Sequence, residues 1–178
     1  MKIGIAGVGG IGSNVAMHLV RSGITNLKFG DFDKIEKSNL NRQFYFEDQI
    51  GKYKAEALRE NLTKISHGNY EYEIIKFNEK NIKDFFKDCD ILVEGFDKKE
   101  FKKLFVEELY DRDKILITVS GIGGVDTSNI QVIQKLKNFY VIGDMVSDIS
   151  KYKTYSHKVN IIAGKISEII LKELYNEK

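Results

Sequence analysis

Residues 3–12 have the sequence IGIAGVGGIG, an apolar run followed directly by a glycine-rich turn. The apolar run, residues 3–6, predicts a short buried strand. The turn has the pattern GxGxxG. In such a pattern Gly7 permits a tight bend, Gly9 lets a phosphate approach the backbone, and Gly12 lets a helix pack closely on the strand. We therefore expect a strand, a turn and a helix in direct succession.

The residues that follow support a nucleotide site. Apolar residues recur at helical spacing at Val15, Leu19 and Val20. A second strand, residues 27–30, then ends directly before Asp31. The helix N-terminus, which includes Gly10, would present free N–H groups to phosphate, and Asp31 can accept hydrogen bonds from both ribose hydroxyls. A GxGxxG pattern alone is weak, but with the strand, helix and acid in this order it predicts a Rossmann-like nucleotide site. The alternative is a glycine-rich turn that only packs a helix.

Strand and helix patterns alternate along the rest of the chain. Residues 51–54 lead a helix that reaches Ile65, and further helices are expected at 78–87, 101–109 and 158–175. Strands are expected at 70–77, 90–94 and 115–120, followed by short antiparallel strands at 130–136 and 139–142. This alternation predicts an α/β fold, a Rossmann-like, doubly wound and mainly parallel sheet with helices on both faces. The short antiparallel strands would lie near its C-terminal side. We expect one domain over residues 1–178.

Composition excludes several classes of protein. The chain has 178 residues, 30% of them charged, a net charge of +2 and one cysteine. No run of residues is apolar and long enough to cross a membrane, which needs about 20 residues. A single cysteine excludes an internal disulfide and a multi-cysteine zinc site, so no zinc is expected. Lysines are scattered rather than clustered, so a nucleic-acid partner is not expected. Because the first strand begins at Lys2, we expect no signal peptide and a cytoplasmic protein.

Polar residues just beyond Asp31 indicate handling of a triphosphate. Two amides and two cations cluster there: Asn39, Gln43, Arg42 and Lys54. Asp97 follows the fourth strand and offers a carboxylate for Mg²⁺, which prefers oxygen ligands. A nicotinamide-dependent dehydrogenase is disfavoured, since such enzymes commonly carry a second domain for the substrate.

Each of these assignments has a structural alternative. Arg42 could pair with Asp33 or Glu36 at the surface, and Lys54 could be a solvated residue in the first turn of its helix. Asp97 could cap the helix that follows it.

Taken together, these residues resemble the ThiF/MoeB/HesA family, relatives of the ubiquitin-activating enzyme. The resemblance covers nearly the whole chain and is carried by GVGGIG at 7–12, DFD at 31–33, SNLNRQ at 38–43, Gly51 with Lys54, and FD at 96–97. The short length and the segment GDMVSD at 143–148 are similar to the compact, thiamine-associated ThiF subgroup. The resemblance implies an adenylyltransferase that uses ATP and Mg²⁺. Its substrate would be the C-terminal glycine carboxylate of a ubiquitin-fold sulfur carrier ending in Gly-Gly.

The resemblance also implies roles for the site residues. The glycine turn, with Gly7, Gly9, Gly10 and Gly12, would hold the nucleotide, and Asp31 the ribose. The triphosphate would be neutralised by two cations, Arg42 and Lys54, and oriented by two amides, Asn39 and Gln43. Asp97 would hold Mg²⁺. The protein would act as a homodimer, with a separate protein as sulfur donor.

The sequence departs from the family pattern in three respects. Larger relatives carry two Cys-x-x-Cys pairs for zinc, and some use a downstream cysteine for thioester or persulfide chemistry. The lone Cys89 fits neither role, because it precedes the fourth strand and has acidic neighbours, Asp88 and Asp90. Many relatives also supply an arginine to the partner subunit from a segment before the first strand, and we expect none here. Lys98 stands where relatives often have asparagine.

Two other functions are compatible with the same fold and motifs. An enzyme of this fold can adenylate another substrate, such as a modified tRNA base, and a non-catalytic scaffold can bind a nucleotide without turnover. We expect Asp33 to be structural. Asp144 and Asp148 could line the path of the carrier's tail, but we favour turn residues.

Overall fold

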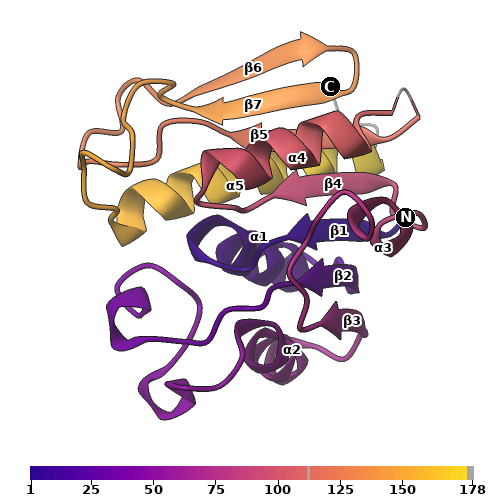
Figure 1. Ribbon diagram of the computed structural model, residues 1–178, viewed down its shortest axis with the longest axis vertical. Helices are drawn as coiled ribbons and strands as arrows, with labels where there is room; N and C mark the ends of the chain where they lie inside the picture. The colour runs from indigo at the N-terminus through magenta and orange to yellow at the C-terminus, as the bar shows by residue number, and fades with distance from the viewer. Residues whose placement is uncertain (112, 176–178) are drawn as a thin grey trace.

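All seven strands of the described residues, 1–111 and 113–175 of a computed structural model, lie in one sheet with the order β3-β2-β1-β4-β5-β7-β6 (Figure 1). The strands are β1 (Ile3–Ala6), β2 (Asn26–Gly30), β3 (Asn69–Glu73), β4 (Ile91–Glu94), β5 (Ile115–Val119), β6 (Gln131–Leu136) and β7 (Phe139–Gly143). Only β6 runs against its neighbour, and β7 pairs parallel with β5. The mainly parallel, Rossmann-like fold expected from the sequence is confirmed.

Helices cover both faces of the sheet. One face packs against α1 (Gly10–Arg21), α2 (Lys54–Ile65) and α5 (Ser156–Tyr175), and the other against α3 (Ile82–Phe85) and α4 (Lys99–Leu109). Residues that alternate along each strand supply the two cores, because successive side chains point to opposite faces. In β1, for example, Ile5 lies in the first core and Ala6 in the second. Within the described residues, none of the helices combines the length and apolar character needed to cross a membrane.

The strand order places a topological switch point beside β1. The chain adds β2 and β3 on one side of β1, and then crosses to add β4 on the other side. The loops after β1 and β4 therefore separate and leave a crevice at the carboxyl ends of the strands. Ligands of open α/β sheets bind in this crevice.

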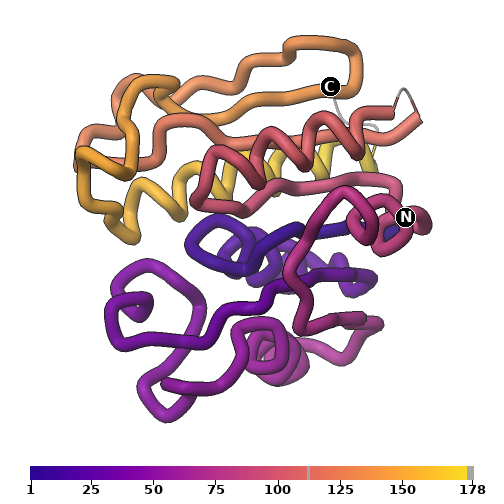
Figure 2. The backbone as a smooth tube through the Cα atoms, viewed as in Figure 1, coloured from indigo at the N-terminus to yellow at the C-terminus, as the bar shows by residue number. Residues whose placement is uncertain are grey.

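The connection between β2 and α2 is the longest in this part of the fold and lies at the same edge. Figure 2 shows it folding into two loops beside the carboxyl ends of the parallel strands. Two short 3₁₀ turns, η1 (Lys37–Asn39) and η2 (Glu47–Gln49), shape these loops. The two ends of the connection meet, since Lys34 and Tyr53 form an antiparallel bridge. Ile35 strengthens this neck, because its N–H donates to the Lys52 carbonyl at 2.9 Å.

Two expected elements are shorter than the sequence pattern suggested. The strand expected at 70–77 ends at Glu73, and Phe77 instead folds over the sheet beside Gly30. The helix expected at 78–87 is a single turn, α3. Asn78 and Asn81 accept hydrogen bonds from nearby backbone N–H groups at 2.9 Å, which favours turns over a continuous helix.

Candidate active site

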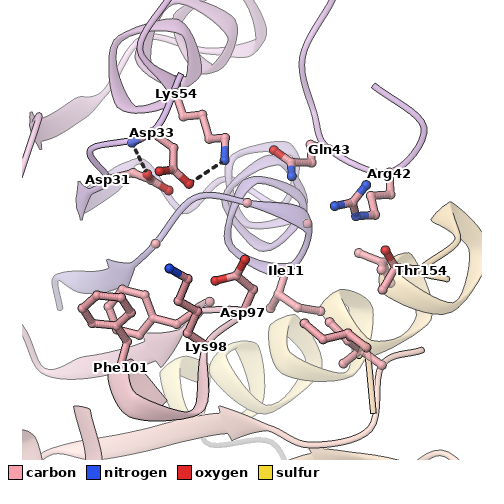
Figure 3. Close-up of a pocket in the computed structure, with 18 of the residues that line it drawn as sticks. Ile11, Asp31, Asp33, Arg42, Gln43, Lys54, Asp97, Lys98, Phe101 and Thr154 are labelled. Atoms are coloured by element: carbon pink, nitrogen blue, oxygen red, sulfur yellow. Dashed lines mark hydrogen bonds and ion pairs between the residues drawn. The ribbon is translucent and has the colours of Figure 1, made fainter. Parts of the chain in front are cut away.

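A cleft of about 280 Å³ opens at the switch point, at the carboxyl ends of β1, β2 and β4 (Figure 3). Its walls come from the glycine turn, the β2–α2 connection, the loop after β4 and the start of α5. Eight of the residues singled out from the sequence line it: Gly7, Gly9, Gly10, Asp31, Arg42, Gln43, Lys54 and Asp97. Gly12 and Asn39 do not line the cleft. The fold therefore brings together residues that are up to 90 positions apart in the sequence.

The glycine turn is shaped by close backbone contacts. Gly7 has φ +84°, a conformation that favours glycine. A Cβ on Gly12 would lie 2.0 Å from the Gly7 carbonyl oxygen, so any larger residue there would push α1 away from β1. Helix α1 begins at Gly10, and no acidic side chain occupies its first turn. Its free N–H groups and positive dipole end can therefore receive an anion.

Asp31 is held rigidly at the end of β2. One carboxylate oxygen accepts the Val8 N–H at 2.8 Å and the other accepts the Asp33 N–H at 2.8 Å. Burial raises the pKa of Asp31, while Lys54 and the two N–H donors act in the opposite direction. Each oxygen retains a lone pair, so the carboxylate can still accept hydrogen bonds from ribose hydroxyls.

Lys54, the first residue of α2, points into the cleft. Its side chain is only 9% exposed, and its ammonium lies 3.1 Å from the Asp33 carboxylate. Asp33 also accepts the Lys54 N–H through its backbone carbonyl at 2.9 Å. The alternative of a solvated lysine is therefore wrong. Asp33 lines the cleft as the partner that fixes this cation.

Arg42 lies at the opposite end of the cleft from Asp31 (Figure 3). Its guanidinium donates to the Ser38 carbonyl at 3.0 Å and to the Asn41 side-chain oxygen at 2.8 Å. Among the residues that the structure describes it forms no ion pair, so the expected alternative of a surface pair with Asp33 or Glu36 is wrong. Burial lowers the pKa of Arg42 and the nearby Asp97 opposes this shift. The remaining N–H donors are available to an anion in the cleft.

The two amides have different surroundings. The side-chain oxygen of Gln43 is buried with no hydrogen-bond partner in the described part of the chain. The atom of Gln43 nearest Gly9 is instead the side-chain nitrogen, 3.7 Å from where a Cβ would be, so its NH₂ group is the part placed to donate to a ligand in the cleft. Asn39 instead accepts the Glu36 N–H at 3.1 Å and stabilises η1. Direct contact of Asn39 with phosphate stays a prediction.

Asp97 leaves its carboxylate free. It is exposed in the cleft, and no hydrogen bond to it occurs in the described residues. The N-cap of α4 is Lys98, without a side-chain cap bond, so the expected capping role of Asp97 is wrong. No group of three or more metal-ligating side chains occurs in residues 1–111 and 113–175. Asp97 nevertheless suits Mg²⁺, which commonly takes one or two carboxylates together with phosphate oxygens and water.

Sequence reasoning missed the polar side chains that hold in place the part of the β2–α2 connection around Arg42, called the Arg42 loop below. Asn14 of α1 donates to the Arg42 carbonyl at 2.8 Å, and the Ser13 hydroxyl accepts the Phe44 N–H at 3.1 Å. Asn61 of α2 donates to the Phe44 carbonyl at 2.9 Å. Beneath them, Tyr45 is buried and donates to the Val8 carbonyl at 2.7 Å. Polar residues on the buried side of α1 were the available signal.

A buried ion pair supports the loop that carries Asp97. Glu94 is fully buried at the end of β4, and both of its oxygens lie 2.9 Å from the Lys102 ammonium. Glu94 also accepts the Phe96 N–H at 2.6 Å and the Val119 N–H at 3.4 Å. The pair thus joins β4, α4 and β5 next to Gly95 and Phe96, which line the cleft.

Asp144 and Asp148 behave as turn residues. Asp144 accepts hydrogen bonds from the Val146 and Ser147 N–H groups at 3.0 and 2.8 Å. It also pairs with the buried Lys158 at 2.6 Å, which holds its pKa well below the usual range. Asp148 pairs with Lys99 at 2.9 Å.

Cys89 lies at the opposite end of the sheet from the cleft. It is buried just before β4, at the amino end of that strand, beside Asp88. Burial and the Asp88 charge raise the pKa of its thiol to about 12. A thiol with this pKa is almost entirely protonated at neutral pH, so it is a poor nucleophile.

The sequence profile of the ThiF family matches residues 1–160. The chain belongs to the ThiF family. This placement agrees with the motifs that line the cleft, because the glycine turn, Asp31, the Arg42 loop, Lys54 and Asp97 all lie within the matched residues.

Curated relatives match one part of the ThiF-type chain. It is 42% identical over 76 residues to ubiquitin-like modifier-activating enzyme 5 of Caenorhabditis elegans, covering 43% of this chain and 18% of that protein. It is 35% identical over 105 residues to the NEDD8-activating enzyme E1 catalytic subunit of Arabidopsis thaliana, covering 58% of this chain and 23% of that subunit. The chain thus spans about a fifth of the length of these relatives.

Solved structures share the fold along nearly the whole chain. The E. coli tRNA N6-threonylcarbamoyladenosine dehydratase in complex with AMP superposes with a TM-score of 0.89 at 18% identity, covering 99% of this chain and 86% of that one. E. coli MccB with ATP superposes with a TM-score of 0.73 at 23% identity, covering 96% and 55%. At these identities the likeness concerns the fold alone.

Proposed function

We propose that this ThiF-type chain is an ATP- and magnesium-dependent adenylyltransferase. Its substrate would be the C-terminal glycine carboxylate of a ubiquitin-fold sulfur carrier protein, and its pathway the biosynthesis of the thiazole of thiamine in the cytoplasm. The proposal includes residues 1–178 as one adenylation domain, of which 112 and 176–178 lie outside the described residues. The observation that carries it is the meeting of Asp31, Arg42, Lys54 and Asp97 around one glycine turn.

The proposed reaction needs no nucleophile from the protein. A carboxylate oxygen of the carrier forms a bond to the α-phosphorus of ATP, and the bond between this phosphorus and the bridging oxygen breaks. The electron pair leaves with pyrophosphate, so the products are the acyl adenylate and pyrophosphate. Catalysis of this kind depends on positioning and on stabilising charge.

Each cleft residue has a defined part in this reaction. Asp31 holds the ribose, and the N–H groups at the start of α1 bind phosphate oxygens. Lys54 and Arg42 stabilise the negative charge that grows on the departing pyrophosphate. Asp97 would hold Mg²⁺, which when bound neutralises phosphate charge. Gln43 would orient a phosphate oxygen by donating from its side-chain NH₂ group, which faces Gly9.

A second candidate substrate is a modified tRNA base that carries a carboxylate. Its support is the superposition on the E. coli tRNA-modifying enzyme, which covers most of both chains. The curated relatives named for ubiquitin-like modifiers favour the carrier protein instead. A scaffold that binds a nucleotide without turnover would not need Arg42, Lys54 and Asp97 in one cleft.

ATP–pyrophosphate exchange tests the proposal. The protein, ATP, Mg²⁺ and labelled pyrophosphate are incubated with a candidate ubiquitin-fold protein ending in Gly-Gly, with the same protein lacking that tail, and with bulk tRNA. Exchange is expected only with the intact carrier. Exchange that depends on tRNA would favour the second candidate. Absence of exchange with either, in a protein that binds ATP, would support the scaffold.

Cys89→Ser is expected to leave the exchange rate unchanged, because the thiol is protonated and lies at the far end of the sheet. Sulfur is then delivered to the acyl adenylate by a separate donor protein. Mass spectrometry of the reaction mixture supplies the check. A carrier covalently attached to Cys89, or loss of sulfur transfer in a folded Cys89→Ser variant, would contradict this assignment.

We also propose a symmetric homodimer. Apolar side chains late in the chain are strongly exposed, with Val125 at 65% and Val146 at 81%. Burial of such side chains between two copies would remove them from water. Light scattering is expected to give twice the mass of the 20.4 kDa chain. The mass of one chain over a wide concentration range would exclude the dimer.

A further inference from the structure

The two ends of the cleft differ in chemistry. One end carries Arg42, Gln43 and the start of α1. The other end is walled by aromatic rings, with the centroids of Phe96 and Phe101 5.4 Å apart and those of Phe77 and Phe96 6.0 Å apart. Phosphate groups suit the first end, and a flat apolar ring system suits the second.

Asp31 lies between these two ends. The Phe96 ring packs on Gly7, 3.1 Å from where a Cβ would be, and Asp31 bonds the N–H of the next residue, Val8. Phe77 packs beside Gly30, the residue before Asp31. Consider a nucleotide whose ribose hydroxyls donate hydrogen bonds to Asp31 and whose phosphates reach the glycine turn. Its base must therefore point toward the aromatic end. This orientation rests on the proposed function.

Lys98 is a cation at the aromatic end that no step of the proposed reaction uses. Figure 3 shows its ammonium pointing into the cleft between Phe101 and Asp97, away from Arg42. Lys54 is paired with Asp33 at 3.1 Å, and Arg42 donates to two neighbouring oxygens. By contrast, the Lys98 ammonium forms no hydrogen bond or ion pair within the described residues, and only the Lys98 carbonyl is engaged, accepting the Lys102 N–H at 3.2 Å. Its ammonium is thus free to donate to an occupant of the cleft.

We propose that Lys98 is a specificity-determining residue that reads the nucleobase of the bound nucleotide. An ammonium group is a donor only, so it selects an acceptor. A purine has free ring nitrogens that accept hydrogen bonds in the plane of the ring, while its faces pack against Phe96 and Phe101. Lys98 donates to one of these nitrogens.

Lys98→Met tests this contact, because methionine keeps most of the length of the side chain and removes the charge. Calorimetry is used to measure the binding of AMP and of ATP with Mg²⁺. The variant is expected to bind both about tenfold more weakly, since a hydrogen bond to a charged group at an exposed position is worth about one power of ten in affinity. The matched control is Lys103→Met on the same helix. Lys103 is 73% exposed and pairs with Glu107 outside the cleft, so its replacement is expected to leave the affinities for AMP and ATP unchanged.

Analogues of AMP locate the contact, with one free ring nitrogen at a time replaced by CH. The wild-type protein is expected to lose about tenfold in affinity for one analogue, and Lys98→Met should bind that analogue as well as it binds AMP. Three results would each overturn the inference. Lys98→Met could bind AMP and ATP as tightly as the wild-type protein, or it could lose affinity for ATP but not for AMP. It could also lose the same affinity for every analogue as it loses for AMP. Those outcomes leave the proposed function standing. Failure of the wild-type protein to bind any adenine nucleotide would overturn both.

Discussion

Arg42→Ala and Asp97→Ala are each expected to slow carrier-dependent ATP–pyrophosphate exchange by at least about 100-fold. Under the proposed function, both side chains act on charge that develops as pyrophosphate leaves. Loss of one preorganised contact of this kind is worth about 3 kcal/mol of activation free energy. Arg42 has no carboxylate partner in the described residues that could account for its position structurally, and the Asp97 carboxylate accepts no hydrogen bond there.

Two variants outside the cleft serve as matched controls. Arg59 is exposed on α2 and Asp84 is 79% exposed on α3, so alanine at either position removes the same type of side chain without touching the cleft. Both are expected to exchange at the wild-type rate. If Arg42→Ala and Asp97→Ala exchange as fast as these controls, the roles assigned to the two residues are wrong.

Lys102→Met is expected to lower the free energy of unfolding by about 3 kcal/mol, because it leaves the carboxylate of Glu94 buried without its cation. Glu94 is fully buried and the Lys102 side chain is only 27% exposed, so water cannot replace the lost partner at low cost. Urea unfolding at neutral pH provides the measurement. Lys103→Met, one residue further along α4, is the control, and its exposed pair should contribute less than about 1 kcal/mol.

The deficit of Lys102→Met should also depend on pH. Burial raises the pKa of Glu94 above its ordinary value of 4.5, and Lys102 opposes that shift. Without the cation the folded-state pKa rises further. A carboxyl whose pKa is higher in the folded than in the unfolded state contributes most to stability below its unfolded-state pKa. This contribution to the free energy of unfolding is lost as pH rises through the folded-state pKa. The gap to wild type should therefore shrink from about pH 8 to about pH 5. An equal gap at both values would show that packing, rather than charge, dominates.

The sequence predicted the parts of the fold that depend on local pattern. The glycine turn needs only adjacent residues, and the close approach of Gly12 to the Gly7 carbonyl is the contact that its spacing implied. The continuation of a strand through Phe77 was wrong, because tertiary packing decides it. Phe77 is only 4% exposed where it folds over Gly30, and its ring centroid lies 5.2 Å from that of Phe85 and 5.3 Å from that of Phe86.

In the candidate site, too, the sequence identified some residues and missed others. Asp31, Arg42, Lys54 and Asp97 were identified because their types and order are informative without coordinates. The partners that fix them were not, since Asn14, Tyr45 and Glu94 become informative only when the chain folds and buries them. A lysine at the start of a helix can extend into solvent or point into a cleft. For Lys54, only the position of Asp33 in the folded chain shows that the side chain points into the cleft.

The bridged neck of the β2–α2 connection has a consequence for how the chain can change. Lys34 and Tyr53 close the connection into a ring, and Asp33 and Lys54 stand just outside the closure. In a closed ring, doubling the length adds only about 0.6 kcal/mol of loop entropy. Insertions near the exposed residues Glu47 and Asp48 should thus leave the two ends in register. The connection is a place where this fold can acquire new segments, or a fluorescent label, while the nucleotide side of the cleft keeps its shape.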